Sequence, residues 1–270
     1  MALPPPSPTS TALVTGASSG IGADLARELA RRGHGVTLVA RREQRLTELA
    51  AELHQAHRVR SEVVALDLTD PAARGDLLGT LTERGLTVEV LVNNAGFSTT
   101  GPVFRSDRQR EMAMIRTDVE AVVDLCSIFT PGMVERGRGS VLNVASTAAF
   151  QPLPGQAGYG ASKAFVLSYS RAIRAELRAS GVTVTALCPG PVKTEFAESA
   201  GFTIEESENS LPKFMWLPAA EVARQAVVGL EQGKGVVIPG FANQVGAQFA
   251  RTMPPQALAA FLARQHPALK

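Results

Sequence analysis

Short runs of β-branched and aliphatic residues alternate with longer amphipathic stretches along the chain from Thr11 onward. One of these stretches, Arg42 to His57, has leucines at positions 46, 49 and 53 and an alanine at position 50, the spacing of one helix face. Strands that alternate with helices form a parallel sheet with crossover helices. We expect seven strands, at Thr11–Thr15, Gly35–Ala40, Glu62–Leu66, Val88–Asn93, Gly139–Ala145, Val182–Leu187 and Val236–Ile238. The alternation therefore predicts an α/β fold with a doubly wound, seven-stranded parallel sheet flanked by helices.

Composition supports a folded protein and argues against several partners. Of the 270 residues, 45% are hydrophobic and 19% are charged, which places the chain among globular proteins. The net charge is only +2 and the basic residues are scattered, so we expect no nucleic-acid partner. Cys126 and Cys188 form no C-x-x-C pair, which predicts neither a disulfide framework nor a metal site and favours a reducing compartment.

The N-terminal segment has neither a basic region followed by an apolar stretch nor a run long enough to span a membrane. We therefore expect a cytoplasmic protein in which a Pro-rich tail, residues 1–10, is poorly ordered. No stretch of linker composition interrupts the series of strands and helices, so residues 11–240 are expected to form a single domain.

Two segments depart from the strand and helix alternation. Residues 195–217 form a long loop after the sixth strand that is rich in aromatic and aliphatic side chains, including Phe202, Ile204, Leu211 and Trp216. This loop is interpreted as a lid over a binding site, or as a segment that packs on the sheet edge. Residues 241–270 form a C-terminal helical extension, in which Phe241, Val245 and Phe249 recur at helical spacing. Core packing or a subunit contact explains these three side chains more readily than membrane docking.

A glycine-rich turn, Thr15 to Gly22, follows directly on the first strand and leads into a helix. This is the context of a dinucleotide-binding turn in a Rossmann-type domain. Gly16 permits the sharp turn, Gly20 lets the backbone approach a pyrophosphate, and Gly22 allows close packing of the helix. The other residues of the turn that we place at the cofactor are Ser18, Ser19 and Ile21.

The end of the second strand indicates which dinucleotide is bound. An acidic residue there would bind the ribose 2′-OH of NAD, but this chain has Ala40, Arg41 and Arg42. The planar guanidinium of Arg41 can hold a 2′-phosphate, and Arg42 shares that role or is a solvated residue at the start of a helix. The sequence therefore predicts NADP(H) in preference to NAD(H).

Tyr159 and Lys163 form a Tyr-x-x-x-Lys pair on a helix, and Ser146 lies thirteen residues before the tyrosine at the end of a strand. Together with the glycine-rich turn, Asn93-Asn94-Ala95-Gly96 and the segment Pro189 to Thr194, this pattern resembles the classical short-chain dehydrogenase/reductase family over residues 11–240. Within that family the closer resemblance is to the ketoacyl-reductase and hydroxysteroid-dehydrogenase-like members. The resemblance implies an enzyme that transfers hydride between a nicotinamide and a carbonyl carbon.

The chemistry of the pair follows from its spacing. Residues four apart lie on one helix face, so the ammonium group of Lys163 is expected beside the phenol of Tyr159 and should lower the pKa of that phenol. Tyr159 then serves as the general acid or base that gives a proton to, or takes it from, the substrate oxygen, and Ser146 hydrogen-bonds the same oxygen. A Tyr-x-x-x-Lys pair on its own would describe an ordinary helix surface.

The resemblance implies further cofactor contacts. Lys163 would hydrogen-bond the nicotinamide ribose beside Tyr159. The residues expected around the adenine, its ribose and the carboxamide are Asn93, Ala95, Gly96, Asp67, Leu68, Pro189, Gly190, Val192 and Thr194. Cys188, next to this last segment, is interpreted as a buried small hydrophobic residue rather than a nucleophile.

One residue departs from the family pattern. Asp118 stands where the family usually has an asparagine that anchors a water molecule in a proton relay to the lysine. A carboxylate adds negative charge there and lacks the amide donor, although its backbone carbonyl can still hold the water. We expect activity that is reduced, but retained, relative to asparagine at this position.

The sequence thus supports an NADP(H)-dependent oxidoreductase for an apolar ketone or secondary alcohol, including 3-oxoacyl and steroid-like compounds. The alternative is a non-catalytic sensor that binds NADP(H) and signals through a partner, although a sensor has no need of a proton donor. The family resemblance also implies a homodimer or a homotetramer.

Overall fold

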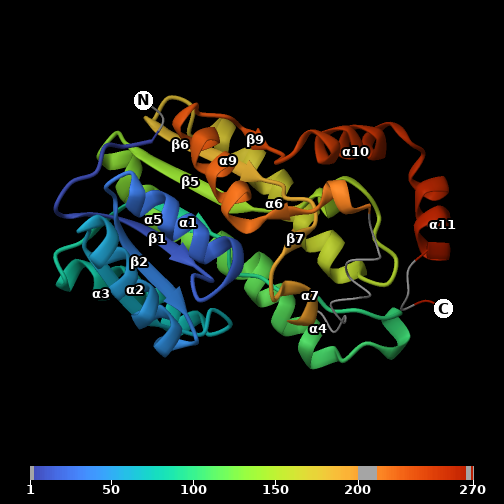
Figure 1. The fold of residues 1–270 in the computed structure, drawn as a ribbon, viewed down its shortest axis with the longest axis horizontal. Helices are drawn as coiled ribbons and strands as arrows, with labels where there is room; N and C mark the ends of the chain where they lie inside the picture. Colours follow the sequence, from blue (N-terminus) through green and yellow to red (C-terminus); the bar gives the residue numbers. More distant parts are fainter. Residues whose placement is uncertain (1–2, 200–211, 266–268, 270) are drawn as a thin grey trace.

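The central feature of the computed structural model, which describes residues 3–199, 212–265 and 269, is a seven-stranded parallel sheet (Figure 1). Its strand order is β3-β2-β1-β4-β5-β6-β9. The strands are β1 (Ser10–Thr15), β2 (Gly35–Ala40), β3 (Ser61–Ala65), β4 (Thr87–Asn93), β5 (Gly139–Val144), β6 (Val182–Leu187) and β9 (Val236–Val237). The predicted fold class is confirmed, and every predicted strand boundary agrees to within one residue.

Helices cover both faces of the sheet, as Figure 1 shows. Alternate strand residues face opposite sides, so Val14 belongs to the core under α1, α2 and α9, whereas Leu13 belongs to the core under α3, α5 and α6. The helices are α1 (Gly20–Arg31), α2 (Glu43–His57), α3 (Pro71–Glu83), α4 (Arg108–Ile115), α5 (Ala121–Glu135), α6 (Ala157–Glu176), α7 (Phe196–Ser199), α9 (Ala219–Glu231), α10 (Phe241–Thr252) and α11 (Pro255–Gln265). The part of the chain that the structure describes also contains short helical turns, which are η1 (Val103–Arg105), η2 (Arg116–Glu120), η3 (Thr147–Phe150) and η4 (Lys213–Met215).

The strand order reverses at β1, which pairs with β2 on one side and with β4 on the other. The crossovers that follow β1 and β4 therefore run in opposite directions and leave a crevice at the carboxyl ends of these two strands. Ligands of open α/β sheets bind at such a switch point. The fold places the glycine-rich turn, which follows β1, and the Asn-Asn-Ala-Gly segment, which follows β4, at this crevice.

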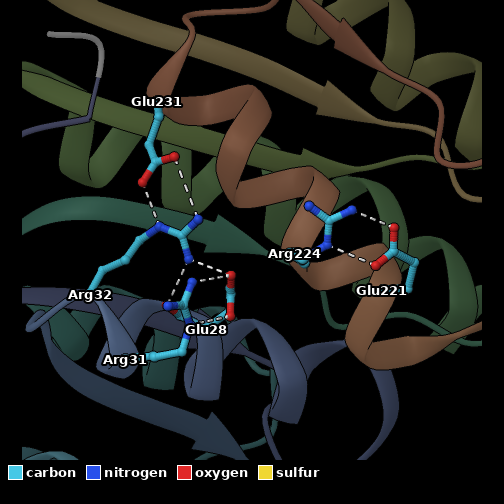
Figure 2. A network of polar contacts seen from close by, with 6 residues as sticks. All are labelled: Glu28, Arg31, Arg32, Glu221, Arg224 and Glu231. Carbon is cyan, nitrogen blue, oxygen red and sulfur yellow. Dashed lines mark hydrogen bonds and ion pairs between the residues drawn. The ribbon is translucent and has the colours of Figure 1, made fainter.

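An ionic network joins α1 to α9 on the outer surface (Figure 2). Arg32 lies between Glu28 on its own helix and Glu231 on α9, with 2.5 Å from Arg32 Nε to Glu231 Oε1. Arg31 also binds Glu28, and Arg224 binds Glu221 on α9. Of these contacts, the one between Arg32 and Glu231 ties the helix that follows the glycine-rich turn to the helix that follows the long loop.

A second, two-stranded parallel sheet holds both ends of that long loop. β7 (Val192–Lys193) pairs with β8 (Leu217–Pro218), and the amide of Leu217 donates a hydrogen bond to the carbonyl oxygen of Pro191 at 3.1 Å. Phe202, Ile204 and Leu211 of the predicted lid lie outside the described residues, so the lid stays a prediction.

The N-terminal tail and the C-terminal extension contain contacts that the sequence did not predict. Disorder of residues 1–10 stays a prediction, but Leu3 is buried and Ser7 and Ser10 exchange hydrogen bonds. In the C-terminal extension, core packing of the three spaced apolar residues is wrong, because Phe241, Val245 and Phe249 are 80%, 52% and 61% exposed. Helix α10 instead buries its opposite face, with Asn243, Ala247 and Ala250.

The described residues (3–199, 212–265 and 269) contain neither a candidate membrane span nor a candidate metal cluster. None of their helices has the length and apolar character needed to cross a membrane. Nor do these residues contain a group of three or more His, Cys, Asp or Glu side chains that could hold a metal ion.

Candidate active site

The glycine-rich turn has the shape of a cradle for a dinucleotide. Gly16 and Gly20 adopt φ of 66° and 54°, a region that favours glycine. A Cβ atom on Gly22 would lie 2.3 Å from the carbonyl oxygen of Gly16, so only glycine permits this approach of helix and turn. Ser19 and Gly20 begin helix α1, whose free amides and dipole favour an anionic phosphate. The residues present therefore fit a dinucleotide cofactor.

Thr15 and Asn94 lock the turn to the end of β4, a pairing that sequence reasoning missed. The hydroxyl of Thr15 accepts hydrogen bonds from the amides of Asn94 at 2.9 Å and Ala95 at 3.0 Å. The Asn94 side chain in turn donates to the carbonyl oxygen of Thr15 at 2.9 Å. The repeated asparagine of the Asn-Asn-Ala-Gly segment was the available signal, since both asparagines are polar residues at a buried strand end.

The neighbouring asparagine has a different role. The Asn93 side chain turns into the sheet and donates to Asn143 Oδ1 at 2.9 Å, so it braces β4 against β5. Beyond it, Ala95 lies against Thr15 of the glycine-rich turn, and Gly96 lies against Asp118 and Lys163. The predicted cofactor contact of Asn93 stays a prediction that would involve its backbone.

The predicted adenosine end contains two arginines with different surroundings. Arg42 donates to the hydroxyl groups of Ser18 at 3.1 and 3.0 Å and Ser19 at 2.7 Å, both in the glycine-rich turn. Arg41 is exposed and lies near Asp67. Burial raises the pKa of Asp67, but the hydrogen bonds from Thr69 and the charge of Arg41 outweigh it, so that pKa is lowered. Leu68 is buried beside this carboxylate.

The segment after β6 lies against the same turn. A Cβ atom on Gly20 would be 3.1 Å from the methyl group of Thr194, so Thr194 covers the start of α1. The carbonyl oxygen of Pro189 accepts a hydrogen bond from the amide of Thr147 at 2.8 Å. Gly190 leaves no room for a side chain, because a Cβ atom there would meet Asn243 Oδ1 at 2.3 Å. Val192 belongs to β7.

The predicted catalytic residues come together at the carboxyl edge of the sheet. Tyr159 and Lys163 lie on α6 and are 9% and 4% exposed, and the Lys163 Nζ atom is 5.6 Å from the centre of the Tyr159 ring. Lys163 also donates to the carbonyl oxygen of Val144, the last residue of β5, at 3.2 Å. The hydroxyl of Ser146, just beyond β5, accepts a hydrogen bond from the amide of Ala148 at 3.1 Å. The four-residue spacing thus brings ammonium and phenol to one face, as predicted.

Asp118 contacts Lys163 directly, which the sequence did not predict. It lies in η2, a π-helical turn between α4 and α5, a distortion that often marks functional sites. Its Oδ2 atom is 2.9 Å from Lys163 Nζ, and its Oδ1 atom accepts a hydrogen bond from the amide of Phe97 at 3.1 Å. A Cβ atom on Gly96 would lie 2.9 Å from the carboxylate and 3.1 Å from the ammonium nitrogen, so glycine makes space for the ion pair.

The ion pair changes the expected electrostatics of Tyr159. Burial raises the pKa of Tyr159, the Lys163 charge and a hydrogen bond from Ser146 lower it, and the Asp118 charge raises it again. The resulting direction is upward, so the net lowering of the Tyr159 pKa that the sequence predicted is not found. Lys163 acts in the predicted direction, but burial and the negative charge of Asp118 outweigh it.

Both members of the ion pair also hold their protons more tightly than usual. Burial raises the pKa of Asp118, against the opposing effects of Lys163 and the Phe97 amide. Burial lowers the pKa of Lys163, but the charges of Asp118 and Tyr159 outweigh it and the direction is upward. Lys163 is therefore a cation at neutral pH whose field is partly cancelled by its partner.

Apolar side chains surround the phenol. Tyr159 packs with Met114 and Ala148, and Phe97 and Leu153 border the same cluster. The ring of Phe196, the first residue of α7, lies with its centre 5.6 Å from that of Tyr159. Cys188 is fully buried, as predicted for a small core residue, and burial raises the pKa of its thiol to about 12.

Comparison with known proteins decides the family. The model of the family described as "short chain dehydrogenase" matches residues 10–203. The chain belongs to this short-chain dehydrogenase family. Sulfoacetaldehyde reductase 2 from Chromohalobacter salexigens is 41% identical over 68% of this chain and 73% of its own length.

Solved short-chain dehydrogenase structures extend the likeness over nearly the whole chain. A short-chain dehydrogenase from Sphingobium yanoikuyae in complex with NADPH is 35% identical, with a TM-score of 0.80 over 93% of this chain and 95% of that one. The bulky-bulky ketone specific alcohol dehydrogenase from Comamonas testosteroni is 30% identical, with a TM-score of 0.75 over 94% and 95%. The present protein, as a member of the short-chain dehydrogenase family, is an oxidoreductase that acts on alcohols or ketones, as the sequence predicted.

Proposed function

We propose that the protein is an NADP(H)-dependent reductase that converts an apolar ketone to a secondary alcohol, or the reverse. The observation that carries this proposal is the convergence of Ser146, Tyr159 and Lys163 beside the glycine-rich turn. A buried phenol with an ammonium group on the same helix face has one evident use, which is to exchange a proton with a substrate oxygen next to the cofactor.

The cofactor supplies a hydride to the carbonyl carbon, or accepts one from the alcohol carbon. Gly16, Gly20, Gly22 and the start of α1 would hold its pyrophosphate. No acidic residue ends β2, and Arg41 with Arg42 can bind a 2′-phosphate. The preference for NADP(H) over NAD(H) is part of the proposal and is supported by these two arginines.

This chain's own residues handle the proton. In the direction of reduction, Tyr159 donates its phenolic proton to the carbonyl oxygen, and Ser146 donates a hydrogen bond to the same oxygen and fixes its position. Lys163 stabilises the phenolate that forms. Asp118 holds Lys163 in place through the 2.9 Å contact and weakens its effect on the phenol. The raised pKa keeps Tyr159 protonated at neutral pH, which suits the acid needed for reduction.

An apolar substrate is supported by what lies around the phenol. Phe97, Met114, Leu153 and Phe196 approach Tyr159 from different elements. Such a surface stabilises carbon chains or rings rather than charged groups. A homodimer or homotetramer, as the family resemblance implies, is part of the same proposal, and light scattering measures it.

The first test is NADPH consumption against ketones graded in chain length and ring number. Turnover is expected to rise with apolar size and to be faster with NADPH than with NADH. The Tyr159→Phe variant should lose about a hundredfold to ten-thousandfold in rate while its dissociation constant for NADPH stays the same. A Tyr159→Phe protein with unchanged turnover would exclude the proposed proton donor, and binding of NADPH with no turnover of any ketone would favour the sensor.

A further inference from the structure

Glu195 forms an ionic junction that neither the family resemblance nor the catalytic residues explain. It follows Thr194, and its carboxylate lies between Arg42, at the N-cap of α2, and Arg45 in the first turn of that helix. Its Oε2 atom is 2.9 Å from Arg42 Nη1, and Arg45 Nη1 lies 2.8 and 3.0 Å from the two carboxylate oxygens. Hydrogen bonds from both arginines lower the pKa of Glu195, so the group is ionised at neutral pH.

Arg42 is shared between this junction and the cofactor cradle. Its Nε and Nη2 atoms donate to Ser18 and Ser19 in the glycine-rich turn, and its Nη1 atom donates to Glu195. A 2′-phosphate at the end of β2 would bring close to two negative charges to the same guanidinium. The phosphate and Glu195 would then repel each other and compete for Arg42.

The residue after Glu195 touches the catalytic tyrosine. Phe196 places its ring centre 5.6 Å from that of Tyr159, at an interplanar angle of 52°. Its amide donates a hydrogen bond to the hydroxyl of Thr194 at 3.3 Å. Because Glu195 and Phe196 are adjacent in the chain, the contact of one with α2 and the contact of the other with α6 hold the same short segment across the site.

We propose that Glu195 is an anionic clasp, which the 2′-phosphate of the cofactor displaces from Arg42, and that its release loosens Phe196 from Tyr159. The inference rests on the proposed function, because it takes the phosphorylated cofactor as the ligand. Glu195 is then a specificity-determining residue that weakens binding of the phosphorylated form. Through Glu195, binding of the 2′-phosphate at Arg42 would also change how freely a substrate reaches Tyr159.

The first experiment measures binding of two nucleotide fragments that lack the nicotinamide. Adenosine 2′,5′-bisphosphate and adenosine 5′-monophosphate are titrated calorimetrically into the wild type, Glu195→Gln and Glu48→Gln. Glu48 is a matched control, because it is an exposed acid on α2 that accepts a hydrogen bond from the side chain of Gln44 at 3.0 Å. Both variants lose one negative charge near the arginines.

Glu195→Gln is expected to bind the bisphosphate about two- to fivefold more tightly than the wild type, the range of an exposed ion pair. Its affinity for the monophosphate should not change, and Glu48→Gln should leave the ratio of the two affinities as in the wild type. An unchanged ratio, or a weaker bisphosphate complex, in Glu195→Gln would overturn the clasp. Failure of the wild type to bind the bisphosphate would instead overturn the proposed cofactor.

The second experiment follows the segment itself by hydrogen exchange of a peptide that covers residues 192–199. Saturating bisphosphate should speed exchange in the wild type, whereas the monophosphate should not. The Glu195→Gln protein should exchange at the faster rate before any ligand is added. Exchange that is unchanged or slower with bisphosphate in the wild type would show that the phosphate does not release Phe196.

Discussion

Two ion pairs of equal length have opposite surroundings in this site. Arg42 and Glu195 are 2.9 Å apart with side chains 44% and 49% exposed, and Lys163 and Asp118 are 2.9 Å apart with side chains 5% and 0% exposed. Water and salt screen the first pair, so another anion can replace Glu195 at Arg42 at little cost in free energy. The two charges of the second pair have lost their hydration, and each is stabilised mainly by the other. Distance alone therefore says little about which contact can open during function.

The largest effect should come from breaking the buried pair. Lys163→Met leaves the Asp118 carboxylate without its cation, and the free energy of unfolding should fall by about 3–5 kcal/mol. Urea denaturation followed by circular dichroism measures this change. The double variant Lys163→Met with Asp118→Leu removes both charges and should recover much of the loss. A double variant as unstable as the single one would show that packing, and not the unpaired charge, causes the effect.

The same variant should respond to pH in a defined direction. Burial raises the folded-state pKa of Asp118, and in Lys163→Met the opposing cation is gone. A carboxyl group with a raised folded pKa stabilises the fold below its unfolded pKa and loses that contribution as pH rises through the folded pKa. The stability difference from the wild type should therefore grow between about pH 5 and pH 8. A stability difference between Lys163→Met and the wild type that is the same at the lower and the upper pH would contradict a protonated Asp118 in the variant.

An intermediate effect is expected from Asp118→Asn, which removes the charge and keeps the shape. The charge of Asp118 raises the pKa of Tyr159, so its loss should lower that pKa and strengthen the influence of Lys163. The pH profile of alcohol oxidation, which needs the phenolate, should move toward lower pH. The rate at neutral pH should rise several-fold, consistent with reduced but retained activity in the natural chain. A variant that loses all turnover would contradict this reading.

The smallest effect on stability should come from the exposed pair. Glu195→Gln is expected to change the free energy of unfolding by less than about 0.5 kcal/mol. The difference should vanish in about 1 M salt, where the Debye length is shorter than a side chain. A loss comparable to that of Lys163→Met would mean that the two junctions do not differ as their exposure indicates.

The sequence was sufficient for the sheet because its central strands β1, β2 and β5 are buried on both faces. Such strands are rich in β-branched and aliphatic residues, and the bounds Gly35–Ala40 and Val182–Leu187 were predicted without error. The glycine-rich turn was also predictable, since steric limits at Gly22 act within a few residues of chain. The approach of Tyr159 and Lys163 was predictable as well, because a four-residue spacing places both side chains on one face of a helix.

Contacts between distant segments could not be predicted in this way. The approach of Asp118 to Lys163 depends on the π-helical turn η2, which no local pattern indicated. The sequence offered Arg41 and Arg42 for a 2′-phosphate, but no local pattern indicated that Arg42 contacts Ser18 and Ser19. The three apolar residues of α10 show the same limit, because helical spacing marks a face without saying what covers it.

The pairing of β7 with β8 makes the long loop a replaceable module. Val192 pairs with Leu217 and Lys193 pairs with Pro218. The two ends of the loop are therefore held side by side near the carboxyl edge of the main sheet. A substitution or a change of length between these two ends is absorbed locally and leaves the register of the seven strands alone. Exchange of this one segment between relatives, with the proton-transfer residues kept in place, therefore tests whether the loop sets the substrate range.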